Sequence, residues 1–289
     1  MARNRKKIGS LLHQLKTSLD NKLAIGQSKF DAKADGTAND KIFSWNTYRA
    51  YLKQGNYFMD YCKEKHNCKT LEECKPYLEE YFEFRKGQNL SNYTLKLDAA
   101  ALSKVFDIDK ETRDKIFRSG KRERADIVRS RGKAARDKHF SITNNKDLIE
   151  FCKSTGLRRS ELAALTGDKL FFKGDKPFIR VDTATKGGRK RVIPVVHNPE
   201  LVVQLMKKAD KGKVFEKIHN AADIHGYRRD YCTEVYNLYA RKIKDIPKAD
   251  RYYCRKDKKG KIYDKAAMQV ASNCLGHNRI SVIAGHYLD

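Results

Sequence analysis

The chain has 289 residues, of which 40% are hydrophobic and 10% aromatic. This is enough for two ordinary domains with packed cores, and it excludes global disorder. Its 62 Lys and Arg outnumber 36 Asp and Glu, which leaves a formal net charge of +26. An enzyme of small metabolites has no need of such self-repulsion. The charge therefore favours a polyanionic partner, nucleic acid first, over a generic solvated basic surface.

The sequence shows neither a membrane-spanning segment nor a signal peptide, and its cysteine spacing bears on the cellular compartment. The sequence contains no run of about 18 apolar residues, so it predicts no membrane span. Residues 1–7 are basic, but no apolar segment of a signal peptide follows them. Among the seven cysteines, Cys62, Cys68 and Cys74 lie six residues apart, which is neither a helical-face repeat nor a common zinc spacing. We expect reduced thiols in a bacterial cytoplasmic, nucleoid-associated protein, with no metal and no cofactor.

The first 118 residues carry helical patterns only. Residues 1–40 read as a polar leader with one short amphipathic helix. Residues 41–118 predict a small all-helical domain of the bundle kind. Within it, a capping box from Thr70 to Glu73 begins one helix, and Ser91 precedes another. The apolar positions of the leader helix are Ile8, Leu11, Leu12, Leu15 and Leu19.

Residues 140–289 mix helix and strand patterns. A helix over 147–152 ends near Gly156, and another begins at Ser160. Three strands joined by glycine-containing turns follow, and a three-stranded antiparallel sheet packed by helices makes the fold α+β. The strands are expected at 169–172, 178–184 and 191–196, and later helices near 199–209, 222–243, 265–274 and 279–287.

Six side chains in this segment match the needs of metal-free cleavage of a DNA phosphodiester. Two guanidiniums suit the charge that develops on the phosphate oxygens. A general acid must protonate the leaving oxygen, and a nucleophile must store the bond energy in a covalent phosphoester. The candidates, in chain order, are Arg158, Lys186, His225, Arg228, His277 and Tyr287.

Each candidate has a plainer explanation when it is taken alone. A lone Arg or Lys is usually a surface charge, a His near a helix end is usually a cap, and such a Tyr usually packs in a core or an interface. Arg159 and Arg229 are alternatives to the arginines beside them. Arg189 and Lys190 are alternatives to Lys186. The combination, in this order, favours catalysis.

The order and context of these residues resemble the tyrosine recombinases, or phage-type integrases, including those of bacterial mobile elements. The Gly-Leu-Arg box at 156–158, the His-x-x-Arg box at 225–228, the Leu-Gly-His box at 275–277 and a Tyr ten residues later all match. The resemblance implies a core-binding domain over residues 41–118, which together with a catalytic domain over 140–289 forms a clamp around DNA. It also implies dimers on a site and tetramers in synapsis.

The resemblance also implies a role for each residue. Arg158 and Arg228 would hold the scissile phosphate, and Tyr287 would form a 3′-phosphotyrosyl link. Lys186 would be the general acid. The two histidines, His225 and His277, would bind the phosphate and manage the tyrosine proton, while Glu161 would order the site.

The chain departs from the family pattern in two places. The connection from Arg228 to His277 is long, and residues 241–265 hold eleven Lys or Arg against four acidic residues. A basic hairpin along the DNA backbone is expected there, with an ordinary solvated hairpin as the alternative. Many relatives carry a further helix after the tyrosine, which docks on a neighbouring protomer. Here only Leu288 and Asp289 follow it, so either the sequence is truncated or subunit coupling uses another element, such as the leader helix.

Double-stranded DNA is the expected partner, and three basic regions are expected to contact it. Residues 119–139 hold eight Lys or Arg against three acidic residues and predict a linker on DNA, with a solvated basic helix as the alternative. Besides recombination, we weigh a non-catalytic DNA-binding protein and a type IB topoisomerase. The expected contacts are Lys121, Arg122, Arg124, Arg129, Arg131, Arg189, Lys190, Arg255, Lys256, Lys258 and Lys259.

Overall fold

The computed structural model describes residues 9–121, 140–255, 258–277 and 279–288. The chain divides into two compact units, residues 1–128 and 129–289. Residues 122–139, which make up most of the predicted linker, lie outside the described residues. The predicted DNA contacts Arg122, Arg124, Arg129, Arg131 and Lys256 therefore also lie outside them. In the part of the chain that is described, no helix has the length and apolar character needed to cross a membrane.

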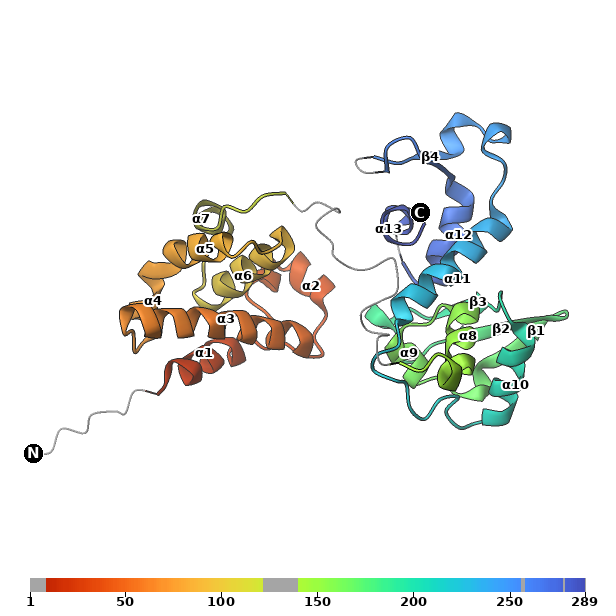
Figure 1. Cartoon of the computed structure of the whole chain (residues 1–289), viewed down its shortest axis with the longest axis horizontal. Coiled ribbons are helices and arrows are strands. Elements are labelled where there is room, and N and C mark those ends of the chain that lie inside the picture. Colours follow the sequence, from red (N-terminus) through yellow and green to blue (C-terminus); the bar gives the residue numbers. More distant parts are fainter. Residues whose placement is uncertain (1–8, 122–139, 256–257, 278, 289) are drawn as a thin grey trace, which may run out of the picture. The chain divides into compact units, whose positions relative to one another are not determined.

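The first unit is built from helices (Figure 1). Hydroxyl side chains fix where several of them begin, because Ser10, Ser44, Thr70 and Ser91 each accept the backbone N–H three residues later. The predicted capping box between Thr70 and Glu73 is present. The helices are α1 (Leu11–Asp20), α2 (Lys29–Ala34), α3 (Trp45–His66), α4 (Leu71–Cys74), α5 (Leu78–Gly87), α6 (Asn92–Val105) and α7 (Lys110–Ile116).

The leader helix α1 belongs to the core of this unit. Its Leu15 and Leu19 are fully buried in one cluster with Phe58 of α3 and Leu102 of α6. Burying such a side chain stabilises the fold by roughly 1.5–3 kcal/mol. Residues before 40 therefore do more than lead into the helical domain, since they complete its core.

The second unit combines a small sheet with helices, which confirms the α+β prediction. Strands β1 (Leu170–Lys173), β2 (Lys176–Val181) and β3 (Arg191–Pro194) form an antiparallel sheet in that order, with Ile179 opposite Ile193. The predicted basic hairpin is also present as β4 (Arg251–Tyr253) and β5 (Ile262–Asp264). The helices are α8 (Lys146–Thr155), α9 (Arg159–Ala163), α10 (Pro199–Ala209), α11 (Ile224–Tyr239), α12 (Lys265–Cys274) and α13 (Ile280–His286).

Gly156 joins α8 to α9 at a point where another residue type would not fit. Its φ is +57°, and a Cβ there would lie 2.2 Å from the ring of Tyr231 on α11. Only glycine combines this left-handed conformation with so close an approach. The close packing of α8 on α11 brings the Gly156 carbonyl and Arg158 towards residues of α11.

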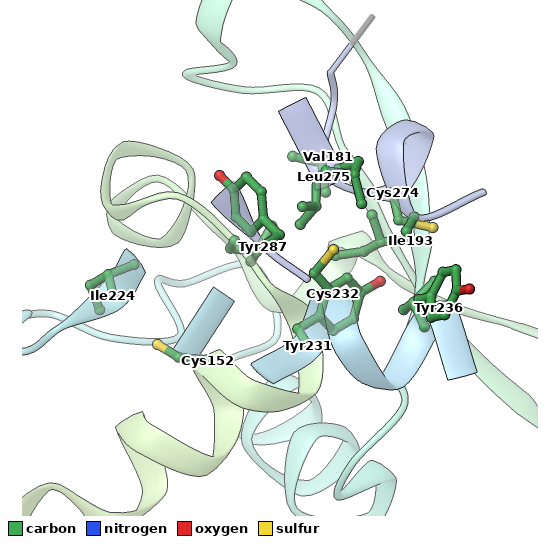
Figure 2. Packing of buried hydrophobic residues seen from close by; sticks show 14 of the residues in the cluster. Cys152, Val181, Ile193, Ile224, Tyr231, Cys232, Tyr236, Cys274, Leu275 and Tyr287 are labelled. Atoms are coloured by element: carbon green, nitrogen blue, oxygen red, sulfur yellow. The ribbon is translucent and has the colours of Figure 1, made fainter. Parts of the chain in front are cut away.

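The core of this unit surrounds the same region. α12 contacts both α11 and α13 as well as β3. Leu157, Tyr231, Leu275 and Tyr287 are all buried members of one apolar cluster, part of which is drawn in Figure 2. Residues far apart in the sequence are therefore held together by packing.

Candidate active site

Arg228 is a buried charged residue of the site, as is Glu161. Arg228 is 1% exposed, and its Nη1 and Nη2 donate hydrogen bonds to the carbonyl oxygens of Gly156 and Leu275. Its Nε donates to the Tyr287 hydroxyl at 3.4 Å, and the guanidinium carbon lies 5.9 Å from the centre of the phenol ring. A buried guanidinium needs such partners, so three separate segments converge on it.

Glu161 organises two further guanidiniums. Its carboxylate is buried and accepts from Arg158 Nη1 at 2.7 Å and from both terminal nitrogens of Arg191 at 2.9 and 2.8 Å. It also accepts the Arg158 backbone N–H at 2.8 Å, where α9 begins. Burial opposes the ionised carboxyl, but the hydrogen bonds and charges of Arg191 and Arg158 lower the pKa of Glu161 from 4.5 to about 2.

The guanidiniums of Arg158 and Arg228 meet at one acceptor. Arg158 Nη2 donates to the Leu275 carbonyl at 3.0 Å, and Arg228 donates to the same oxygen. Gly276, with φ +64°, adjoins the guanidiniums of two arginines, since a Cβ there would lie 3.2 Å from Arg191 Nη1 and 3.5 Å from Arg158 Nη1. Arg158, Arg191 and Arg228 bring three guanidinium charges to the site, and the one carboxylate of Glu161 pairs with the first two. The excess positive charge suits an anion such as a phosphate.

His277 lies next to the tyrosine hydroxyl. Its Nε2 is 3.3 Å from Tyr287 Oη, and the two ring centres are 5.5 Å apart. Burial, followed by the charges of Arg228 and three other basic residues, lowers the pKa of His277 from 6.5 to about 4. The imidazole is therefore neutral at pH 7, and its Nε2 can accept a proton from the phenol in the tautomer protonated on Nδ1.

Lys186 and His225 are both exposed, on segments that lead to residues of this cluster. Lys186 is exposed in the short 3₁₀ turn Lys186–Gly188 between β2 and β3, and its charge is one of those that lower the pKa of His277. His225 is exposed on the first turn of α11, three residues before Arg228. Arg189 and Lys190, the alternatives to Lys186, are exposed in the same connection. Hydrogen bonds within the cluster connect Arg158 and Arg191 to Glu161, and Arg228 and His277 to Tyr287.

The structure distinguishes Arg158 from its neighbour. Arg159 donates to the carbonyls of His219, Asn220 and Ala222, so its guanidinium braces a loop instead of joining Glu161. At the other position, Arg228 is buried in the cluster while Arg229 is partly exposed.

Arg191 is the site residue that sequence reasoning missed. Its Nε donates to the Cys274 carbonyl at 2.7 Å, in addition to its paired contacts with Glu161. In the sequence it is only the first residue of a strand after two other basic residues. A buried Glu161 needs more than one cationic partner, and that requirement could have pointed to it.

The structure corrects the prediction that Lys258 contacts DNA. The side chain is 8% exposed, and its Nζ donates to the carbonyl oxygens of Ala284 at 3.0 Å and of Leu288. A lysine placed at the C-terminal end of α13 satisfies carbonyls that have no partner within the helix, and it complements the helix dipole. Arg255 and Lys259, on the same hairpin, are exposed.

The hairpin that carries Lys258 is itself anchored to the end of α11. Arg241 donates to the buried Asp264 carboxylate from Nε and Nη2, both at 2.8 Å. The Tyr236 hydroxyl accepts the Asp264 backbone N–H at 3.0 Å. Lys258 therefore links the α13 end, beside Tyr287, to the helix that carries Arg228.

Replacing Lys258 with methionine is expected to loosen the end of α13. The change keeps the apolar stem and removes charge-assisted hydrogen bonds, which contribute about 1.5–3 kcal/mol. Hydrogen exchange at the Tyr287 and Leu288 amides should therefore accelerate by about 10-fold or more. Lys259→Met, at the exposed neighbour, is the control. Equal exchange rates in both variants would show that Lys258 does not hold the helix.

Comparison with known proteins identifies the fold. No protein-family model matches the chain, and no curated protein matches it in sequence. The XerH site-specific recombinase, in a post-cleavage complex with palindromic difH, is similar with a TM-score of 0.53 and 15% identity, over 94% of this chain and 90% of that chain. The Tn1549 transposon integrase in complex with circular intermediate DNA gives 0.47 and 14%, over 96% and 95%. The similarity to XerH shows that the chain has the tyrosine recombinase fold.

Proposed function

We propose that the protein is a site-specific DNA recombinase that cleaves and rejoins DNA through Tyr287. One observation carries this proposal: the Tyr287 hydroxyl lies 3.4 Å from Arg228 Nε and 3.3 Å from a neutral His277 Nε2. It does so in a cluster with excess positive charge. A protein that only binds DNA has no need of a phenol between a buried guanidinium and a proton acceptor.

The proposed reaction is a transesterification. His277 Nε2 accepts the phenol proton as Tyr287 Oη attacks the phosphorus, and the bond from phosphorus to the 5′ oxygen breaks. Lys186 donates a proton to that leaving oxygen, while Arg158 and Arg228 stabilise the charge on the non-bridging oxygens. Attack by another strand's 5′ hydroxyl reverses these steps and releases Tyr287.

Two residues have supporting roles in this scheme. Glu161 holds Arg158 and Arg191 in place, and exposed His225 adds a phosphate contact. Because Arg228 lies beneath the phenol, we expect phosphate binding to move Tyr287 off the guanidinium and towards the phosphorus. The binding free energy of the DNA would then contribute to placing the nucleophile.

The proposed partner is double-stranded DNA, bound by dimers on each site and by tetramers in synapsis. The net charge of +26 supports a polyanionic partner, and XerH, whose fold this chain shares, is in complex with its difH substrate. We propose that residues 41–118 form the core-binding domain and 140–289 the catalytic domain. The basic residues that remain candidates for DNA contact and lie within the described residues are Lys121, Arg189, Lys190, Arg255 and Lys259.

Covalent trapping tests the proposal. The protein is incubated with a library of randomised duplexes nicked near each candidate cleavage position, so that the cleaved end diffuses away and the adduct accumulates. We expect a DNA–protein adduct whose modified peptide contains Tyr287, and the captured DNA gives the target sequence. Tyr287→Phe should bind the library and give no adduct, while Tyr239→Phe, at an exposed tyrosine of α11, should react as wild type.

Each remaining outcome rejects the proposal in a different way. An adduct that persists in Tyr287→Phe removes that residue as nucleophile. Binding by the wild type without any adduct indicates a DNA-binding protein that lacks catalysis. Relaxation of supercoiled plasmid without strand exchange indicates a topoisomerase.

A further inference from the structure

Three cysteines of the first unit converge although their spacing in the sequence does not suggest it. Cys62 lies near the C-terminal end of α3, Cys68 follows that helix, and Cys74 ends α4. Their Sγ atoms all lie within 4.8 Å of one another. Cys62 and Cys74 are fully buried, and Cys68 is 6% exposed. Among the residues described, no other group of three or more metal-ligand side chains converges in this way.

The backbone around the three thiols is fixed by local contacts. α3 ends at Asn67 in the left-handed conformation, with φ +53°, and the Cys68 N–H donates to the Cys62 carbonyl at 3.3 Å. The capping box between Thr70 and Glu73 then begins α4, which returns Cys74 to the other two thiols. The sulfur positions follow from this turn, so binding would require little ordering of the chain.

The leader helix α1 braces the same turn. The Gln14 side chain donates to the Lys69 carbonyl at 2.9 Å and accepts the Leu71 N–H at 3.1 Å. The turn is therefore held from outside as well as by its own hydrogen bonds. This bracing joins α1, α3 and α4 around the cysteines.

We propose that Cys62, Cys68 and Cys74 bind a thiophilic metal ion, with Zn²⁺ as the ion of choice. Soft thiolates select such ions, and Zn–S bonds of about 2.3 Å require sulfurs roughly 3.8 Å apart. The observed limit of 4.8 Å is close enough for small side-chain shifts to reach this. The ion stabilises the corner between α3 and α4 and takes no part in chemistry on DNA.

With three protein ligands, the fourth coordination position would fall to water, and Cys68 is the least buried of the three thiols at 6% exposed. His66 is near in the sequence, but its ring stacks on Tyr77 with centres 3.6 Å apart. Its Nε2 also contacts Glu80 at 3.0 Å. Zinc accepts three protein ligands with water in the fourth position, although structural zinc sites more often have four protein ligands.

The plainer explanation is that the cysteines serve as small apolar core residues. Cys152, in the second unit, is such a residue, since it is 1% exposed and belongs to no convergent group of metal ligands. Core packing needs contact with any apolar neighbour, whereas Cys62, Cys68 and Cys74 place their sulfurs against one another. This difference provides a matched control.

Metal content of the full chain tests the proposal. The protein is purified in reductant without a histidine tag, loaded with Zn²⁺ or Co²⁺, and dialysed. We expect one tightly held ion per chain by elemental analysis, and a near-ultraviolet thiolate-to-Co²⁺ charge-transfer band. Both should disappear in Cys68→Ser and Cys74→Ser and persist in Cys152→Ser. Circular dichroism confirms that each variant is folded.

Two results would overturn the proposal. One is wild-type protein that retains no ion and shows no charge-transfer band after loading. The other is a folded Cys68→Ser or Cys74→Ser variant that keeps the ion as Cys152→Ser does. Neither readout involves DNA, so metal binding and the proposed recombinase activity stand or fall separately.

Discussion

Replacing Glu161 with alanine is expected to lower the free energy of unfolding of the second unit by about 3–5 kcal/mol. The carboxylate is buried and is the acceptor shared by Arg158 and Arg191. Removing it leaves the guanidiniums of Arg158 and Arg191 without their carboxylate acceptor. Arg158 shares the Leu275 carbonyl with the buried Arg228, so like charges then lie close together without compensation. Glu161→Gln, which keeps the shape and loses the charge, should fall between alanine and wild type.

Chemical denaturation measures the effect, and the chain supplies an internal reference. Its single tryptophan, Trp45, lies in the first unit, so tryptophan fluorescence follows that unit while circular dichroism follows both. The Glu161 variants should shift the dichroism transition and leave the fluorescence transition in place. Glu150→Ala is the control, because Glu150 pairs with Lys153 and His197 near the surface and should cost no more than about 1 kcal/mol. Equal shifts for the two positions would contradict the role of Glu161.

The same comparison has a defined dependence on pH. The pKa of Glu161 is lowered from 4.5 to about 2 on folding, so the ionised carboxyl favours the folded state. This contribution is complete above about pH 4.5 and is lost as the pH falls towards 2. The stability difference between wild type and Glu161→Gln should therefore be constant near neutral pH and shrink on acidification.

Features fixed by nearby residues were predictable from the sequence. The start of α4 follows from the Thr70 hydroxyl, the end of α8 from Gly156, and the β4–β5 turn from the glycine at 260. The fold class followed as well, because helix and strand periods differ. The candidates Arg158, Arg228, His277 and Tyr287 could be named because they lie in short motifs whose order and spacing resemble those of the tyrosine recombinases.

Features that depend on distant partners were not predictable. Arg191 and Glu161 are 30 residues apart, and so are Lys258 and Leu288. Local sequence periodicity indicates each element but does not indicate how distant elements pack against each other. A count of charges treats Lys258 as a DNA contact like Lys259, although one is buried and the other exposed. The three clustered cysteines show the same limit, because a turn between two helices, not a repeat, brings them together.

Arg228 is expected to be the position where substitution costs most in cleavage. Under the proposed function, its guanidinium both stabilises the charge on the phosphate and contacts Tyr287. Removing one such donor typically lowers the rate by about 10²–10³-fold. Arg228→Ala should lose at least this much in single-turnover cleavage of the trapped target. It should also lose stability, because the Gly156 and Leu275 carbonyls lose their donor.

Arg228→Lys separates chemistry from folding. Lysine keeps the charge, but one ammonium cannot reach Gly156, Leu275 and Tyr287 with the fixed fork of a guanidinium. We therefore expect DNA binding within a few-fold of wild type in gel shifts, together with a cleavage rate close to that of Arg228→Ala. Arg159→Lys is the control, because its guanidinium braces the loop at 219–222 and not the phosphate site. If Arg228→Lys cleaves at the wild-type rate, a positive charge alone suffices at this position. The bidentate contact of the guanidinium with the phosphate would then not be required for cleavage.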